Sequence, residues 1–220
     1  MTDPQHDGVE LLDSDAPIEV SEPEGLDPEA LERRSAALAQ VRKFGDPVLR
    51  SPASPVSDFD SDLAQEVERL IEIMRDGMGV GLAATQLGVL RRLMVFQAGA
   101  DAVPTALINP EIEWASAEDL ATAEEGCLSI PGIVVDVERP LFVRVRALDP
   151  AGEPLTVEAS GLEARVIQHE VDHLDGVLIL QRTNREQRKG AMRALREGET
   201  FAPERPEDEP GEDAETDPAV

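Results

Sequence analysis

The segment IQHEVDHLDG, residues 167–176, holds two of the three histidines of the chain at positions four apart. On a helix, side chains at this spacing lie on one face about 5–6 Å apart, so His169 and His173 can bind one cation. Glu170 follows His169 directly and lies beside that face, where it can reach a water on the cation without displacing it. This pattern is typical of metal-dependent hydrolases, a class that contains many unrelated families.

The helix that carries this segment is predicted over residues 161–176, with Gly176 as its C-terminal stop. Leu162 and Val166 share the face of the two histidines, so we expect that face to point into the protein. Two solvent-facing histidines on a charged helix are the alternative. Burying two titratable rings is costly unless something uses them, so the apolar face favours a metal site.

The other elements occur as one helix, several strands in runs and then further helices, which indicates an α+β domain. Apolar residues at helical spacing predict a core-packing helix from Asp62 to Met78, and alternating apolar and charged residues predict a hairpin over 139–159. The remaining expected segments are a polar helix over 28–40, a glycine-rich stretch over 77–88, strands over 91–97 and 108–115, a loop over 124–132 and a basic helix over 183–197.

The formal charge of −26 is concentrated at the two ends of the chain. Residues 1–32 hold 11 acidic and no basic residues, and residues 197–220 hold 10 acidic residues against one arginine. These ends contain many prolines and few large apolar residues, so they cannot bury enough surface to offset the entropy of ordering. We therefore expect a catalytic domain over 41–197 between two disordered acidic segments, 1–40 and 198–220. Their simplest role is solubility, and contact with a basic partner is the alternative.

The single cysteine, Cys127, excludes an intramolecular disulfide, so nothing points to an oxidising compartment. The first 35 residues lack the features of a signal peptide, and no apolar run approaches the length of a membrane span. We expect a cytoplasmic protein with no membrane partner.

A catalytic metal site of this kind needs three protein ligands and an open position, so the third ligand distinguishes the families. The remaining histidine, His6, lies in the acidic leader, and Glu186 follows the histidine pair at too short a spacing for a glutamate-type metallopeptidase. Cys127 is left as a candidate, although a lone cysteine is more often a small buried hydrophobic residue. A metallopeptidase of the HExxH type, with a different third ligand, stays the alternative.

Three motifs resemble the signature motifs of the peptide deformylases, in the same order and with similar separations. They are GVGLAATQ at 79–86, EGCLS at 125–129 and QHEVDH at 168–173. GDPVLR at 45–50 and INPE at 108–111 are also similar to that family, so the resemblance covers about residues 41–183. It implies removal of the N-formyl group from the initiator formyl-methionine of nascent polypeptides, with release of formate. It also implies an α+β fold in which antiparallel sheets pack around the central helix with the histidines, plus a C-terminal helix.

The same resemblance implies a role for each motif residue at the metal. Cys127, His169 and His173 bind the ion, and Glu170 accepts a proton from water and passes it to the leaving amine. The implied cofactor is one divalent ion, natively Fe(II). Zinc, nickel or cobalt can also occupy a site that includes a soft thiolate ligand.

The resemblance further implies how the substrate is held. Gln86 and the backbone N–H of Leu128 stabilise the oxyanion, and Gly81 lets the chain pass close to the site. The formyl-methionyl chain end lies extended, and its first side chain enters an apolar pocket. Its backbone pairs near Val80 and Gly126, and the pocket is lined by Val80, Leu162 and Val166.

Two positions depart from the pattern of the family. Arg165 falls where some members have an aliphatic residue, and its long stem would cover the pocket wall. Val134 stands where some members carry an arginine near the substrate. Either Arg139 or Arg144 replaces that contact, or the contact is absent.

The predicted final helix carries a basic stripe. Its members are spaced 3, 4, 4 and 3 apart: Arg182, Arg185, Lys189, Arg193 and Arg196. Such a stripe is either a solvated face or, in a family that acts on nascent chains, a contact with ribosomal RNA. No contact with DNA is expected.

Overall fold

The computed structural model describes residues 27–99 and 102–204, so the disorder expected for the ends falls largely outside the described part of the chain. The helices are α1 (Pro28–Gln40), the 3-10 helix η1 (Pro47–Arg50), α2 (Ser61–Asp76), the 3-10 helix η2 (Ala84–Leu87), α3 (Gly161–Leu174), α4 (Ile179–Arg182) and α5 (Arg185–Glu197). The strands are β1 (Gly81–Ala83), β2 (Leu93–Phe96), β3 (Thr105–Ala115), β4 (Leu120–Gly126), β5 (Val134–Pro140), β6 (Phe142–Leu148) and β7 (Pro154–Ser160). No helix within these ranges is long and apolar enough to cross a membrane.

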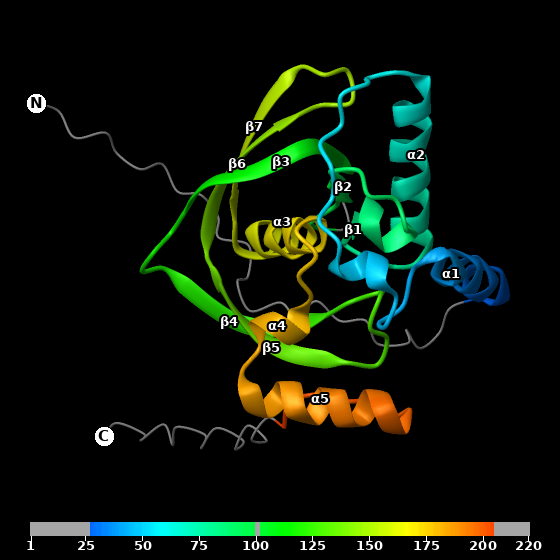
Figure 1. Cartoon of the computed structure of the whole chain (residues 1–220), viewed down its shortest axis with the longest axis vertical. Helices are drawn as coiled ribbons and strands as arrows, with labels where there is room; N and C mark the ends of the chain where they lie inside the picture. Colours follow the sequence, from blue (N-terminus) through cyan, green and yellow to red (C-terminus); the bar gives the residue numbers. More distant parts are fainter. Residues whose placement is uncertain (1–26, 100–101, 205–220) are drawn as a thin grey trace, which may run out of the picture.

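The strands form two antiparallel sheets, and α3 lies between them (Figure 1). The larger sheet has the order β1-β2-β3-β6-β7, and the smaller sheet pairs β4 with β5. Strands β6 and β7 form the expected hairpin, with Phe142 opposite Ser160 and Leu148 opposite Pro154. The α+β class and the central position of the histidine-bearing helix are therefore confirmed.

Helix α3 is buried along nearly its whole length because both sheets cover it. Every residue from Ala164 to Leu174 is buried. Val166 and Ile167 belong to the same apolar cluster as side chains of β6. The chain leaves the helix at Gly176, where φ is +73° and a Cβ atom would lie 2.7 Å from the carbonyl of Arg50. Glycine is required at this point because a side chain would meet that backbone.

Two sequence predictions about strands need correction. The loop expected over 124–132 is wrong at its start, because β4 continues to Gly126 and pairs with β5. Residues 77–88 contain β1 and η2, which a glycine-rich composition does not reveal. In both places the strand forms by pairing with the next strand along the chain, β2 for β1 and β5 for β4, so the composition of the segment alone was a poor guide.

The polar helix predicted over 28–40 is present as α1, and it packs against α2. Ala37 and Val41 are buried in the same apolar cluster as Leu70 of α2. Packed structure therefore begins at Pro28, ahead of the expected domain start near Val41, because a narrow apolar stripe on α1 suffices to dock it.

Candidate metal centre and active site

Three chain segments meet at one buried cavity: the β1–η2 segment, the turn after β4, and α3. Cys127 follows the last residue of β4, while His169 and His173 lie one turn apart on α3. Their candidate ligand atoms all lie within 4.8 Å of one another. The fold therefore brings the three expected ligands together from two distant parts of the sequence.

The donor set fits a divalent metal ion. Bonds of about 2.3 Å to sulfur and about 2.0–2.1 Å to nitrogen place the ligand atoms of a tetrahedral site about 3.5 Å apart. The distance from Cys127 Sγ to His173 Nε2 is 3.2 Å, which is close to that value. The cavity lined by Cys127 and His169 has a volume of ≈ 20 Å³, which is room for about one water molecule.

The charges around these residues favour the metal-binding form of Cys127. Burial opposes ionisation of the Cys127 thiol, but His173 and His169 hold its pKa well below the ordinary value. Burial also opposes protonation of His169, but Cys127 and Glu125 hold the pKa of its imidazole well above the ordinary value. The thiolate is the metal-binding form of cysteine, and this surrounding stabilises it.

Glu170 lies in the same cavity with one carboxylate oxygen unused. Its Oε2 atom is buried and has no hydrogen-bond partner among the described residues. Burial raises the pKa of Glu170 to about 7, although His169 and His173 act in the opposite direction. A Cβ atom on Gly81 would lie 2.5 Å from Glu170 Oε1, so only glycine leaves room for this carboxylate.

Two donors face the cavity from opposite sides. The Oε1 atom of Gln86 accepts the backbone N–H of Ala83 at 2.9 Å, which leaves its Nε2 atom directed toward Cys127 Sγ at 3.7 Å. The backbone N–H of Leu128 donates to no backbone carbonyl in the described part of the chain. A side-chain amide and a backbone N–H are thus both available to an oxygen atom in the cavity.

The cavity wall contains most of the residues expected to contact substrate. Its lining residues are Gly79, Val80, Gly81, Gln86, Gly126, Cys127, Leu128, Val166, His169 and Glu170. Leu162 is not among them; it is half-buried against the cluster between α3 and the larger sheet. The structure therefore brings Val80, Gly126 and Val166 to the cavity, and it adds Gly79.

A buried ionic network supports His169 from behind. The Oε2 atom of Glu125 lies 2.9 Å from His169 Nδ1, which leaves His169 Nε2 for a metal. Glu125 is fully buried, and it accepts hydrogen bonds from Arg139 Nη2 at 2.9 Å and Arg165 Nη1 at 2.8 Å. Burial acts to raise the pKa of the Glu125 carboxyl, but Arg139 and His169 hold it well below its usual range. Arg139 also binds Asp172 on α3 at 2.9 Å.

Sequence reasoning missed this network. Glu125 stands in EGCLS and Asp172 in QHEVDH, but neither received a role. The available signal was the general rule that metal-binding histidines give their second nitrogen to a carboxylate or carbonyl. That rule does not say which residue is the partner, because the partner of His169 lies on a different strand, β4.

The same network bears on the two positions that depart from the family pattern, Arg165 and Val134. The Arg165 guanidinium points into the network and also donates to the carbonyls of Val137 and Ala121, so its stem does not cover the pocket wall. Arg139 is occupied by Glu125 and Asp172, and Arg144 pairs with Glu158 at an exposed position. Neither arginine lines the cavity, so neither replaces a contact at Val134.

An α+β fold with a buried Cys-His-His triad and a neighbouring glutamate defines a candidate metal-dependent hydrolase. The sequence model of the family described as polypeptide deformylase matches residues 38–189. The peptide deformylase of Acidothermus cellulolyticus is 47% identical over 163 residues, which cover 74% of this chain and 88% of that protein. Peptide deformylase 1 of Corynebacterium glutamicum is 46% identical over 167 residues, 75% of this chain and 98% of that protein.

Solved structures of peptide deformylases also match this chain. A crystal structure of a peptide deformylase from Synechococcus elongatus in complex with actinonin matches with a TM-score of 0.67 and 43% identity, over 73% of this chain and 88% of that one. Peptide deformylase from Thermotoga maritima matches with a TM-score of 0.63 and 48% identity, over 66% of this chain and 96% of that one. The chain belongs to the peptide deformylase family.

Proposed function

We propose that this protein hydrolyses the N-formyl group from the initiator formyl-methionine of nascent polypeptides and releases formate. The observation that carries the proposal is the cavity itself, in which Cys127, the histidine helix, Gln86 and the Leu128 N–H converge. A metallopeptidase of the HExxH type is not favoured, because its third ligand would not be the cysteine that lies here 3.2 Å from His173.

The proposed roles follow from the contacts. Cys127, His169 and His173 would hold a divalent metal ion, which would lower the pKa of a bound water toward about 7. Glu170, which lines the same cavity, would accept a proton from that water as its oxygen adds to the formyl carbon, and would pass the proton to the amine as the C–N bond breaks. We propose Fe(II) as the native ion, with zinc, nickel or cobalt able to bind the same thiolate and imidazoles. Metal analysis of protein purified without oxygen tests this choice.

The oxygen of the formyl group gains negative charge when the water oxygen adds to the formyl carbon, before the C–N bond breaks. Gln86 Nε2 and the Leu128 N–H are proposed to donate to it, because both are fixed before substrate arrives. Such preorganised donors lower the barrier more than groups that must first reorient.

The peptide is proposed to bind as an added strand between the two sheets. Strands β1 and β4 are edge strands of their sheets, and Val80 and Gly126 at their ends both line the cavity. Main-chain pairing there would position an extended chain end of any sequence. Val80 and Val166 would receive the methionine side chain, and Leu162 would extend that apolar wall one turn earlier on α3.

Formate release from a formyl-methionyl peptide tests the function. We expect release by anaerobically purified, iron-loaded protein, and at least about 10²-fold slower release by Glu170→Ala, since that change removes the group that moves protons. Glu186→Ala, which alters an exposed glutamate on α5, is the matched control. Absence of release by the wild-type protein would refute the proposal. A Cys127→Ser variant that keeps its metal would favour the metallopeptidase.

We further propose that the protein acts in the cytoplasm, at the ribosome. A cytoplasmic setting agrees with a single cysteine that is free of any disulfide. The ribosome contact is proposed for the basic residues of α5, namely Arg185, Lys189, Arg193 and Arg196, which are all exposed. Arg182 leaves the predicted stripe, because it lies on α4 and binds Asp172. Co-sedimentation with ribosomes measures this contact.

A further inference from the structure

Ser129, the last residue of the EGCLS motif, has no part in the chemistry described above. It is completely buried, and it lies in the tight turn after β4 in which Ile130 N–H donates to the carbonyl of Cys127 at 2.9 Å. Its own backbone carbonyl accepts the N–H of Phe44 at 2.8 Å, so the turn is fixed from outside. Its hydroxyl oxygen lies 3.3 Å from Gln86 Nε2, directly behind the cavity.

The amide group of Gln86 has one acceptor atom and two donor hydrogens, and each has a direction in this fold. The acceptor is used by the Ala83 N–H at 2.9 Å, which determines which end of the amide is oxygen. One hydrogen on Nε2 points to Ser129 Oγ. The second hydrogen donates to Cys127 Sγ at 3.7 Å, on the side where the cavity begins.

A single contact at Oε1 would not fix this arrangement. The last torsion of glutamine has a broad energy profile, so an amide held only at its oxygen can rotate and turn both hydrogens away from the cavity. The Ser129 hydroxyl adds a second contact at the nitrogen. With both ends held, the plane of the amide is defined.

We propose that Ser129 is a positioning residue that acts through Gln86: by accepting one amide hydrogen, it directs the other at the carbonyl oxygen of the formyl group. The inference rests on the proposed deformylase function and deepens it. It assigns the Gln86 donor its direction, and it gives the buried serine of the motif a task distinct from metal binding.

Ser129→Ala is the informative variant, because it removes a single oxygen atom and leaves the chain direction unchanged. We expect kcat for a formyl-methionyl peptide to fall about tenfold, less than the about 10²–10³-fold cost of losing an oxyanion donor altogether. KM should change less than about twofold, since the donor matters chiefly in the transition state. Metal content should equal that of the wild type.

Ser116→Ala is the matched control. Ser116 is also a buried serine, and its hydroxyl donates to the carbonyl of Asp119 at 2.7 Å in the turn between β3 and β4, outside the cavity. This variant should keep the kcat of the wild type. An equal fall in kcat in both variants would attribute the effect to general loosening of the fold and overturn the proposal.

A double-mutant cycle with Gln86→Ala decides whether Ser129 acts through the amide. If it does, adding Ser129→Ala to Gln86→Ala causes no further fall in kcat, because the group to be positioned is gone. A further tenfold fall would overturn the proposal. Loss of metal from Ser129→Ala alone would also overturn it, because Ser129 would then support Cys127.

Side-chain amide NMR separates this inference from the proposed function. In the wild type, the two Nε2 hydrogens of Gln86 should give distinct, slowly exchanging signals, and in Ser129→Ala they should exchange faster. Unchanged signals would refute the orienting role even in an active enzyme. A wild-type protein that releases no formate would refute the deformylase function, while the amide signals would still report whether Ser129 orients Gln86.

Discussion

At the scale of single residues, burial in the site shifts the pKa values of side chains away from their ordinary values in water. Glu170 is the main case. It is 3% exposed, and this burial raises its pKa to about 7. A carboxyl group whose pKa lies near neutral pH can both accept and return a proton, which is what hydrolysis of an amide needs. Gly81 makes this placement possible, because any side chain there would occupy the space of the carboxylate.

The raised pKa of Glu170 predicts a pH-dependent stability in metal-free protein. Folded Glu170 keeps its proton up to about pH 7, whereas an unfolded glutamate loses it near about pH 4.3. The stabilising contribution is therefore fully present below about pH 4.3 and is lost as the pH rises through about 7, by roughly 4 kcal/mol in total. Urea unfolding of wild-type and Glu170→Gln protein across this range should show the wild type losing that much relative to the variant. A difference that does not change with pH would contradict the assignment.

At the scale of elements, β4 carries charge into the core and thereby supports a candidate metal ligand on α3, His169. Glu125 faces inward from β4, Arg139 from β5 and Arg165 from α3, so one carboxylate joins three elements. Both guanidinium groups keep their charge. Burial and the neighbouring Arg139 lower the pKa of Arg165 while Glu125 acts in the opposite direction, and Arg165 stays protonated at neutral pH. The network thus ties the small sheet to the helix at the point where His169 is held.

We predict that Glu125→Gln destabilises the protein by about 3–5 kcal/mol, because two buried arginines lose their anionic partner while the shape is preserved. Glu158→Gln is the control. It breaks the exposed pair with Arg144 on the β6–β7 hairpin and should cost at most about 1 kcal/mol. Denaturant unfolding at neutral pH measures both. Equal and small losses in the two variants would show that the buried network does not join the elements as described.

The secondary structure could be predicted well where the pattern is local. The periodicity of α2 and α3 and the alternation along β6 and β7 were sufficient, because one face of each element is apolar. Strand β4 could not be found in this way. Its acidic residues argue against a buried strand, and only Arg139 and Arg165 make Glu125 tolerable there. The arginines that offset the burial of Glu125 can be identified only from the tertiary structure.

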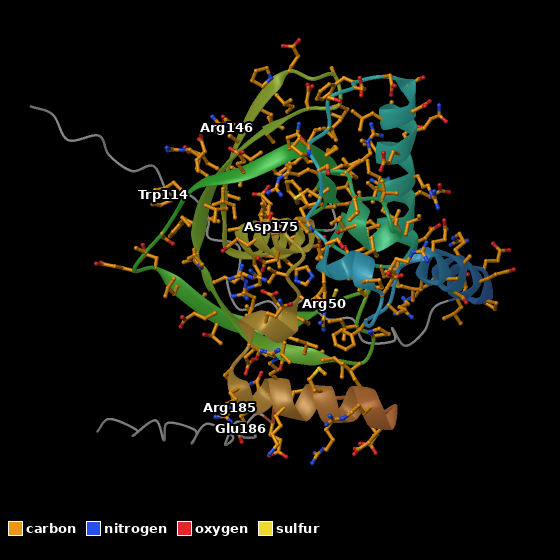
Figure 2. All side chains as sticks on the ribbon, in the orientation of Figure 1. Arg50, Trp114, Arg146, Asp175, Arg185 and Glu186 are labelled. Carbon is orange, nitrogen blue, oxygen red and sulfur yellow. The ribbon has the colours of Figure 1, made fainter. Side chains whose placement is uncertain are left out.

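At the scale of the whole molecule, the fold separates the chemistry from the basic surface. The catalytic cavity lies between the sheets beside α3, whereas α5 packs against β5 on the outer side of the small sheet (Figure 1). Figure 2 shows Arg185 and Glu186 on α5, away from α3. Changes to the exposed charges of α5 should therefore leave the chemistry intact.

Reversing charge at Arg185, Lys189 and Arg193 with glutamate should weaken co-sedimentation with ribosomes at moderate salt, because phosphate contacts depend on cations. Formate release from a free peptide should stay unchanged. The same reversal at Arg33, Arg69 and Arg75 of α1 and α2 is the control for net charge, and it should keep more of the binding. Unaltered co-sedimentation of the α5 variant would show that this face is only solvated.

The sequence by itself determined the helix that carries the histidine pair, the α+β class and, through the resemblance of its motifs, the set of candidate metal ligands. The helix follows from a local pattern of residues, and the candidate ligands follow from short motifs that resemble those of a known family. Only the tertiary structure decided how the motifs cooperate. It placed Glu125 behind His169, directed Arg165 away from the pocket, and brought Ser129 against Gln86. Such contacts join residues far apart in the chain, and their direction depends on how two sheets close around one helix.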